Sequence, residues 1–399
     1  MDRDFATFDI CIIGASIAGN YLCYLLSKTN LKIIVIEEHT EIGLPFQCAG
    51  IVSQKLTKLI DIPNELILNH VNTAKIVSSS GEFIKLSGQE RPYVINRVGL
   101  DNFFYDKLKN RKNISFLLGE KFKSFKYVKL NHQKYVLVKT SRRKITAKML
   151  IGSDGPLSTV GRILGIKNKI LYAVQYRIES QFDDDEAVMF FDERWKELFA
   201  WIVPEGKNVY RIGMASSKNI VDNFRIFLKK FKLNQEKKID QQGGLIPYGI
   251  MNKMAFDNVL LLGDSAGQVK ATTGGGIIML LTAAKYAAYC IKKCFKNNNF
   301  SAKSIRKYYQ NQCNITIGKE LKIHFIIRAF LENMTDKDFK NVFKIIKFSK
   351  IENLISIYGD MDFPRSLLFK LIKNPLFVFF IIKCLIKNPQ LITKIFRLL

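Results

Sequence analysis

The chain has 399 residues, 48% of them hydrophobic, and a formal net charge of +27 from 62 Lys and Arg against 35 Asp and Glu. A hydrophobic share of this size excludes a chain that is disordered throughout, and the length predicts two or three domains. The positive charge favours an acidic partner: nucleic acid, an anionic membrane surface or an acidic protein. A general compositional bias toward Lys is the alternative.

The seven cysteines include no C-x-x-C pair, which argues against a zinc ribbon or a thioredoxin-like site. Cys290 and Cys294 share a helix face without a nearby His, so we expect core packing and no metal. The odd count and the absence of a signal-peptide pattern favour a cytoplasmic setting. No apolar run reaches roughly 18–20 residues, so no transmembrane helix is expected.

Residues 9–37 have the pattern of a strand, a glycine turn, a helix and a second strand. Gly14 permits a sharp turn and Gly19 permits close packing of the helix, whose N-terminal N–H groups can hold a pyrophosphate. Glu37 ends the second strand, where an acid binds the ribose hydroxyls. The pattern predicts an adenine-dinucleotide site, although Ser16 replaces the second glycine. The alternative is the same turn without a ligand.

Two later strands also end in glycine and aspartate, at Asp154-Gly155 and at Gly263-Asp264. A strand that ends in this way in a doubly wound fold places Asp264 beside the ligand crevice, where it can bind ribityl hydroxyls. The glycine run 274–276 opens the next helix, whose N-terminus can face a flavin ring and a pyrophosphate.

These motifs, together with the R-x-x-x-D segment of Arg97 and Asp101, resemble flavoproteins of the hydroxybenzoate-hydroxylase type over residues 9 to about 290. The resemblance implies FAD as the cofactor and an α/β fold. We expect a discontinuous Rossmann-type FAD-binding domain at 1–165 and 255–300. An inserted antiparallel β-sheet substrate domain is expected at 166–254, and a helical, basic C-terminal region at 301–399.

The loop "PFQCAG" at residues 45–50 resembles the P-x-x-C-[AG]-G loop of geranylgeranyl reductases within that superfamily. The segment "FAWIVP" resembles the substrate segment of the same family, although Val203 stands where Phe is usual and Ala271 where a later Pro is usual. The resemblance implies that Cys48 lies beside the flavin and reaches the substrate cavity. The alternative for Cys48 is a small buried residue that fills a tight loop.

The resemblance also assigns site residues one by one. Lys121 is expected near the adenine through its backbone alone. The expected FAD contacts are Gly14, Ser16, Ala18, Gly19, Glu37, Cys48, Ala49, Ile51, Arg97, Lys121, Asp264, Gly274, Gly275, Gly276 and Ile277. The expected substrate-cavity residues are Phe199, Trp201, Pro204 and Gly213.

Strand-like segments rich in aromatic residues between 170 and 216 predict a second sheet over the flavin. Such a sheet can form an apolar slot for a hydrocarbon chain, and ordinary sheet core is the alternative. After residue 300 the chain is expected to be helical, and Asn-Pro pairs at 374–375 and 388–389 divide its end into short helices. Cations among the large apolar residues of 365–399, from Lys370 to Arg397, predict an interfacial helix on an anionic membrane. Packing on the protein's own core or on a second subunit is the alternative.

We therefore expect an FAD-dependent reductase that saturates C=C bonds of geranylgeranyl chains, on archaeal-type diether phospholipids, with Cys48 as proton donor or cavity wall. The rivals are an FAD monooxygenase or halogenase of the same superfamily and a lipid-binding flavoprotein without turnover. The chain has no second dinucleotide motif, so the electron donor is expected to be a docked NAD(P)H or a ferredoxin. We expect no nucleic-acid partner and a cytoplasmic, peripheral membrane location.

Overall fold

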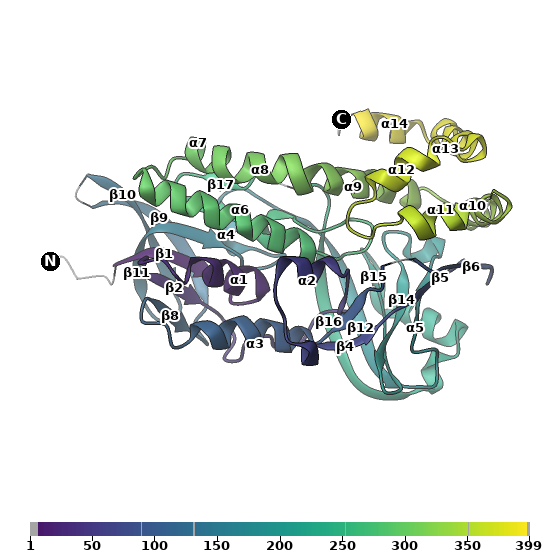
Figure 1. Cartoon of the computed structure of the whole chain (residues 1–399), viewed down its shortest axis with the longest axis horizontal. Coiled ribbons are helices and arrows are strands. Elements are labelled where there is room, and N and C mark those ends of the chain that lie inside the picture. Colours follow the sequence, from purple (N-terminus) through teal and green to yellow (C-terminus); the bar gives the residue numbers. More distant parts are fainter. Residues whose placement is uncertain (1–6, 89, 131, 252, 350, 397–399) are drawn as a thin grey trace.

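A computed structural model describes residues 7–88, 90–130, 132–251, 253–349 and 351–396. Two sheets lie side by side in an elongated molecule, and helices run along one long side (Figure 1). The helices of the C-terminal region gather at the end of the molecule that holds the second sheet (Figure 1).

The first sheet has the strand order β17-β18-β11-β1-β2-β8, and its four central ladders are parallel. The hairpin β9–β10 pairs antiparallel with the start of β11. Central strands of this kind are buried on both faces and read as continuous apolar runs, as β2 does. The strands are β1 (Thr7–Ile13), β2 (Ile33–Ile36), β8 (Ile114–Leu117), β9 (Phe122–Leu130), β10 (Gln133–Thr140), β11 (Lys144–Gly152), β17 (Ala255–Phe256) and β18 (Val259–Leu261).

Helix α1 packs against both α3 and α6 beside the first sheet. A small three-stranded sheet of β3, β7 and β4 leads toward the second sheet. The bounds are α1 (Ile17–Leu26), β3 (Ile51–Val52), α2 (Lys55–Leu59), β4 (Ile67–His70), β7 (Tyr93–Ile95), α3 (Arg97–Leu108), α4 (Thr159–Ile163), α6 (Ile277–Lys296), α7 (Ala302–Ile305), α8 (Asn311–Cys313) and α9 (Lys319–Glu332).

The second sheet has the order β16-β12-β15-β14-β13-β5-β6. Its strands β12 to β16 pair antiparallel, as expected for the inserted sheet, and α5 packs on β12 and β15. Two further strands, β5 and β6, come from much earlier in the chain, and β13 pairs with β5 in parallel. The bounds are β5 (Thr73–Val77), β6 (Phe83–Leu86), β12 (Lys169–Glu179), β13 (Glu186–Phe190), β14 (Ala200–Gly206), β15 (Val209–Ser216), α5 (Ile220–Lys230) and β16 (Lys237–Tyr248).

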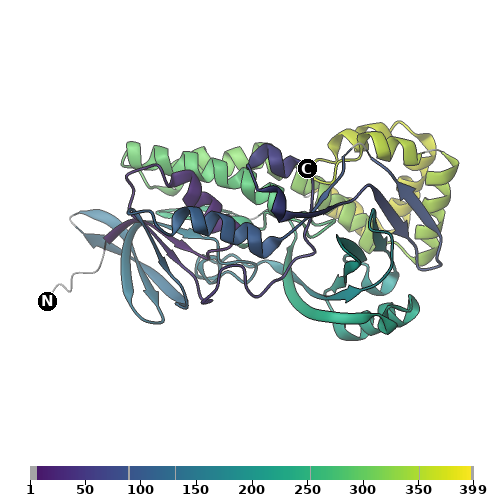
Figure 2. The ribbon, with the colours of Figure 1, turned by 60° about the horizontal axis from the view of Figure 1, so that its bottom comes forward.

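The C-terminal region consists of α10 (Asp336–Phe348), α11 (Ile351–Tyr358), α12 (Arg365–Leu371), α13 (Pro375–Lys387) and α14 (Pro389–Phe396). Asn374 caps α13 by accepting a hydrogen bond from the N–H of Phe377, and both Asn-Pro pairs stand at helix starts, where proline fits. Helices α10 to α12 share an apolar cluster with Ile84 of β6, so part of this region packs on the protein itself. Figure 2 shows these helices beside the β5–β6 hairpin.

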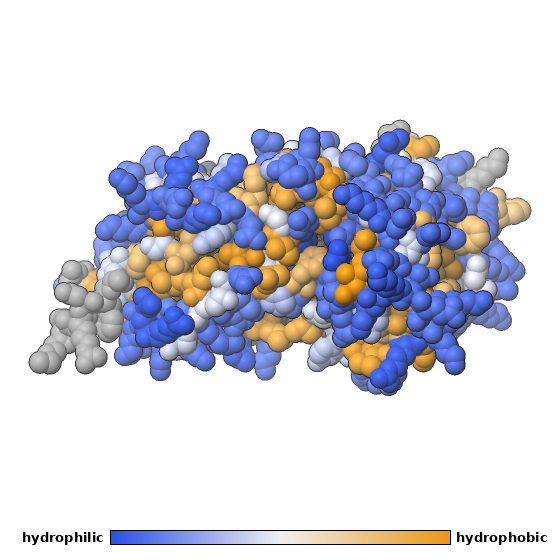
Figure 3. Space-filling view, turned by 90° about the horizontal axis from the view of Figure 1, so that it is seen from below, coloured by the Kyte–Doolittle hydropathy of each residue, from blue (hydrophilic) through white to orange (hydrophobic). Residues whose placement is uncertain are grey.

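The outer surface of the molecule is mainly hydrophilic on the side shown in Figure 3, where hydrophobic side chains form a band across the middle. None of the helices within the described ranges is both long and apolar enough to cross a membrane. Arg397, which the sequence analysis counted among the C-terminal cations, lies outside the described residues.

Candidate functional site

The turn between β1 and α1 requires its two glycines. Gly14 has a φ of +96°, and a Cβ at this position would lie 2.4 Å from the carbonyl oxygen of Ser153 at the end of β11. A Cβ on Gly19 would lie 2.0 Å from the carbonyl oxygen of Gly14. The hydroxyl of Ser153 donates to the carbonyl of Ile13 at 2.7 Å, which fixes β11 against the turn. The turn is therefore a bare backbone cradle, which a phosphate group can approach closely.

The carboxylate of Glu37 lies beside this cradle. Its Oε2 accepts a hydrogen bond of 2.8 Å from the N–H of Ala15, and its Oε1 accepts one of 3.0 Å from the N–H of His39. The carboxylate is therefore held at the end of β2, next to the first turn. This is the place where an acid binds the ribose hydroxyls of a dinucleotide.

Asp264 approaches the same turn from β18. A Cβ on Gly263 would lie 3.1 Å from the Cβ of Ala18, and one on Gly276 would lie 3.5 Å from Oδ1 of Asp264. Burial raises the pKa of Asp264 to about 6, although Arg97 acts in the opposite direction. Within the described ranges, no protein group donates a hydrogen bond to this carboxylate. The side chain is half-buried, and the hydroxyls of a ribityl chain could donate to this carboxylate.

The residues present therefore fit FAD. Helix α6 begins at Ile277 with Gly276 as its N-cap, so the free N–H groups of its first turn lie at the same place. Glu37 and the Gly263-Asp264 segment both lie beside the first turn and the start of α1. All of these residues were predicted from the sequence.

Arg97 lies at the start of α3 and reaches the first turn through Asp101. Its guanidinium donates to both oxygens of Asp101, at 3.2 and 3.1 Å, and the hydroxyl of Ser16 lies 3.3 Å from the same carboxylate. Burial raises the pKa of Asp101, and the pairing with Arg97 opposes this effect. The structure therefore brings Arg97 and Ser16 together, as an R-x-x-x-D segment beside the cofactor would require.

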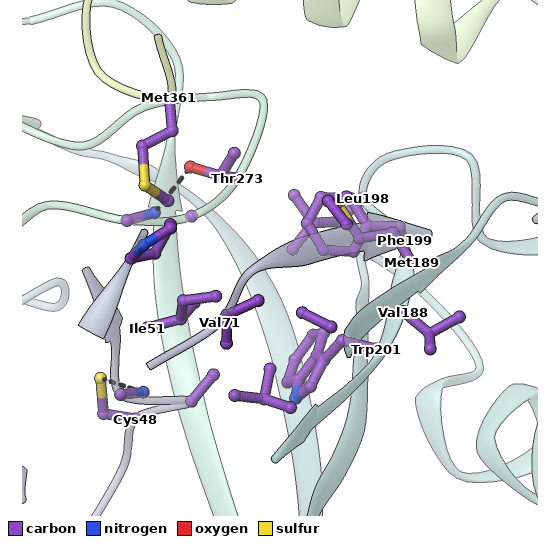
Figure 4. A pocket seen from close by; sticks show the side chains of 18 of the residues that line it. Cys48, Ile51, Val71, Val188, Met189, Leu198, Phe199, Trp201, Thr273 and Met361 are labelled. Atoms are coloured by element: carbon purple, nitrogen blue, oxygen red, sulfur yellow. Dashed lines mark hydrogen bonds between the residues drawn. The ribbon is translucent and has the colours of Figure 1, made fainter. Parts of the chain in front are cut away.

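A largely apolar cavity of about 480 Å³ lies between the Cys48 loop, the second sheet and the C-terminal region. Figure 4 shows Cys48 and Ile51 on one side of it, Trp201 and Phe199 on another, and Thr273 with Met361 on a third. Its lining also includes Ala49, Gln175, Val203, Gln242, Gly274 and Gly275. The cavity therefore joins the loop before α6 to a wall of large apolar side chains.

The indole of Trp201 packs directly against the backbone of Gly213, which leaves no room for a side chain at that position. A Cβ there would lie 2.6 Å from the ring. Val203 lines the cavity where the family usually has Phe, so the wall is less bulky at this point. Pro204 lies outside the lining, and its carbonyl accepts a hydrogen bond of 3.3 Å from Asn69.

Lys121 lies close to the end of β2, where the N–H of the preceding residue, Glu120, donates to the carbonyl of Glu37 at 2.9 Å. The exposed side chain of Lys121 pairs with Glu38, and its backbone N–H and carbonyl both bond with Ser141, at 3.1 and 2.8 Å.

The described ranges contain no group of residues that could hold a metal ion. Cys48 is partly exposed, whereas the other six cysteines are buried.

Several polar residues around the cavity were not predicted from the sequence. Gln175, Arg211, Lys270 and Asp362 are all buried, and each forms hydrogen bonds or ion pairs described below. One signal was available: Arg211 interrupts the apolar strand "VYRIGMA", where a charged residue needs a partner. No comparable signal marked Gln175 or the contact between Lys270 and Asp362.

The fold and the site together define a flavoprotein with a Rossmann-type FAD-binding domain and a cavity roofed by a second sheet. Residues 12–52 match the family described as an NAD(P)-binding Rossmann-like domain. The chain is 25% identical to a digeranylgeranylglycerophospholipid reductase of Methanosarcina acetivorans, over 87% of this chain and 90% of the relative.

Two solved structures extend the comparison. A geranylgeranyl bacteriochlorophyll reductase-like protein from Thermoplasma acidophilum is 20% identical, with a TM-score of 0.79, and the match covers 99% of this chain and all of the other. A halogenase in complex with FAD is 14% identical, with a TM-score of 0.66 over 91% of this chain and 85% of the other. The expected fold class, the FAD cofactor and the resemblance to geranylgeranyl reductases are thereby confirmed.

Proposed function

We propose that this protein is an FAD-dependent reductase that saturates C=C bonds in the geranylgeranyl chains of archaeal-type diether phospholipids. One observation carries the proposal: Cys48, the loop before α6 and the apolar wall of Phe199 and Trp201 line a single cavity. Relatives named digeranylgeranylglycerophospholipid reductases match most of the chain and support the same reaction.

The cavity has the volume of sites that take one elongated apolar ligand. Its largely apolar walls suit the hydrocarbon chain that is to be reduced, and polar residues such as Gln175 and Gln242 line it together with Cys48. FAD, when bound, supplies the hydride for one alkene carbon. Cys48 is placed to deliver a proton to the other carbon or to form part of the wall.

The test separates this reductase from a monooxygenase of the same superfamily. The reduced FAD-loaded protein is supplied with a geranylgeranyl diether lipid, with and without oxygen, and the product is weighed by mass spectrometry. A reductase adds hydrogen and needs no oxygen. Incorporation of an oxygen atom, or a strict need for oxygen, would favour the monooxygenase.

The C-terminal region supports peripheral attachment to an anionic membrane. Phe379 on α13 and Phe369 on α12 are 67% and 60% exposed, and Ile386 is 73% exposed. Large apolar side chains rarely gather on a surface without a partner, and the neighbouring cations suit anionic headgroups. The cations are Lys370, Lys373, Lys383 and Lys387. The prenyl-lipid substrate would lie in the same surface.

Attachment is tested with vesicles that contain anionic lipid. The double variant Phe379→Asp/Ile386→Asp should sediment with the vesicles much less than the unaltered protein, and salt should weaken binding of the latter. Val221→Asp on α5 is the matched control, because Val221 is also exposed but lies on the second sheet's helix. Equal sedimentation of the double variant would show that α13 is not the attachment surface.

A further inference from the structure

Two neighbouring carbonyl groups of the Cys48 loop are held by side chains of the second sheet. The amide nitrogen of Gln175 donates to the carbonyl of Cys48 at 3.1 Å. The guanidinium of Arg211 donates to the carbonyl of Ala49 at 2.9 Å. Gln175 lies on β12 and Arg211 on the adjacent strand β15, so one rigid sheet holds the loop at two consecutive points.

The orientation of Gln175 follows from its partners. The indole N–H of Trp201 can only donate, and it lies 2.9 Å from Oε1 of Gln175. The carbonyl of Cys48 can only accept, so it must face the NH₂ group. That group also donates to Oε1 of Gln242 at 2.8 Å. Gln175 therefore links the indole in the cavity wall to the backbone of Cys48. A single orientation of its amide satisfies all three partners.

Arg211 is held in place by a second set of contacts. Its side chain is 2% exposed, and its Nε donates to Glu205 at 2.9 Å. Glu205 also pairs with Arg177, which reaches Asp240 at 2.7 Å. Asp240 in turn accepts a hydrogen bond of 3.3 Å from Gln242. These polar contacts form a continuous chain from the carbonyl of Cys48 to the carbonyl of Ala49, and the backbone between the two residues closes it into a ring.

Gly50 shows how close this contact is. Its φ is +77°, and a Cβ at this position would lie 1.9 Å from a guanidinium nitrogen of Arg211. The same residue donates its N–H to the sulfur of Cys48 at 3.2 Å. The glycine of the Cys-Ala-Gly sequence is therefore needed because the guanidinium occupies the space of a side chain.

We propose that Gln175 and Arg211 are positioning residues that hold Cys48 at the cavity, and that Trp201 fixes Gln175 for this task. Their contribution to alkene reduction rests on the proposed function, but their hold on the loop does not. The hold can be measured without turnover, because Cys48 is the one cysteine among the seven described that is not buried. Its alkylation rate in the FAD-loaded protein reports how firmly the loop is held.

The experiment measures alkylation of Cys48 by iodoacetamide, with peptide mass spectrometry to identify the site. Gln175→Met removes both donors at nearly the same size, and we expect alkylation about five-fold faster, as for the loss of one hydrogen bond. Gln133→Met on the exposed hairpin of the first sheet is the matched control and should leave the rate unchanged. An unchanged rate in a folded, FAD-loaded Gln175→Met protein would overturn the proposal.

A double-mutant cycle tests the part played by Trp201. Trp201→Phe keeps a ring in the wall but removes the indole N–H, so Gln175 can turn and release Cys48. Alone it should also accelerate alkylation, and combined with Gln175→Met it should add little, because both changes act on one chain of contacts. Fully additive effects would contradict the link through Gln175.

Arg211→Lys supplies a variant that keeps the buried charge beside Glu205. A lysine cannot donate to Glu205 and to Ala49 in the same geometry, so alkylation should again be faster. If this variant does not fold, the Gln175 and Trp201 variants still decide the question. If the variants are alkylated faster but the unaltered protein does not reduce prenyl lipids, the positioning role stands and the proposed function is rejected. If the unaltered protein reduces prenyl lipids but the variants are alkylated at its rate, only the positioning role is rejected.

Discussion

The ammonium of Lys270 lies 2.6 Å from a carboxylate oxygen of Asp362, and both side chains are buried. Lys270 belongs to the loop before α6, and Asp362 belongs to the segment between α11 and α12. Lys270 also donates to the carbonyl of Met361, a residue of the cavity lining, at 3.0 Å. The pair therefore joins the cofactor loop to the C-terminal wall of the cavity.

Removal of one member of this pair should destabilise the protein strongly. Asp362→Asn leaves the Lys270 charge buried without a counter-charge, so the free energy of unfolding should fall by about 3–5 kcal/mol. Urea unfolding measures the change. The double variant Lys270→Met/Asp362→Leu should recover most of it, whereas Asp106→Asn, in an exposed pair with Lys109, should change the stability little. A loss that small in Asp362→Asn would contradict the role of the pair.

His324 on α9 gives the protein a defined response to acid. Its Nε2 lies 3.1 Å from the carbonyl of Asp362 and its Nδ1 lies 2.6 Å from the hydroxyl of Thr272. Burial, followed by the charge of Lys270, lowers the pKa of His324 to about 4, while Asp362 and Asp360 act in the opposite direction. In the folded protein the imidazole is therefore neutral at pH 6, with its proton on Nε2.

Because the folded pKa of His324 lies below the unfolded value, the unfolded chain binds the proton more tightly. The contribution of His324 to stability is complete above about pH 6.5 and is lost as the pH falls toward 4, by roughly 3 kcal/mol in total. The difference in unfolding free energy between the unaltered protein and His324→Gln should shrink over this range. A difference that does not change between pH 7 and pH 4 would show that His324 titrates normally.

Loss of either carboxylate at the FAD site should weaken cofactor binding while the fold persists. Glu37→Ala and Asp264→Ala each remove the carboxylate that we propose binds cofactor hydroxyls, and we expect the FAD dissociation constant to rise about ten-fold or more. Quenching of flavin fluorescence measures it. The exposed Asp61→Ala serves as control. Full flavin occupancy in both purified variants would count against these contacts.

Cys48→Ser should retain FAD but slow alkene reduction. Serine fits the loop, since the sulfur accepts one hydrogen bond from Gly50 and a hydroxyl can do the same. A hydroxyl is a much weaker acid than a thiol, so it delivers a proton less readily. It also makes the cavity wall more polar at this point. Single-turnover kinetics with a prenyl lipid measure the effect. If Cys48→Ser reacts at the rate of the unaltered protein, Cys48 only fills the loop.

The FAD site could be predicted from the sequence because its determinants are local. Gly14, Gly19 and Glu37 lie within one βαβ unit, and Gly263-Asp264 ends a strand, so backbone geometry alone brings them together. Phe199 and Trp201 were expected in the cavity because their segment resembles the substrate segment of a known family. Resemblance to a family supplied Cys48.

The contacts around Cys48 could not be predicted, because they join segments far apart in the chain. Gln175 and Cys48 are 127 residues apart, and Arg211 and Ala49 are 162 apart. The contribution of β5 and β6 to the second sheet was missed for a related reason: a parallel pairing with β13 leaves no local signal in either segment. The C-terminal region was predicted as helical, but its packing on Ile84 depends on that same unpredicted hairpin.

The most direct test of the account is a single turnover without oxygen. The reduced, FAD-loaded protein is mixed with a geranylgeranyl diether lipid, and flavin absorbance and lipid mass are followed together, with the fully saturated lipid as control. The account predicts that the absorbance of oxidised flavin returns at the same rate as the lipid gains two hydrogens, and that the saturated lipid causes neither change. Flavin that stays reduced while the unsaturated lipid is bound and unaltered would contradict it.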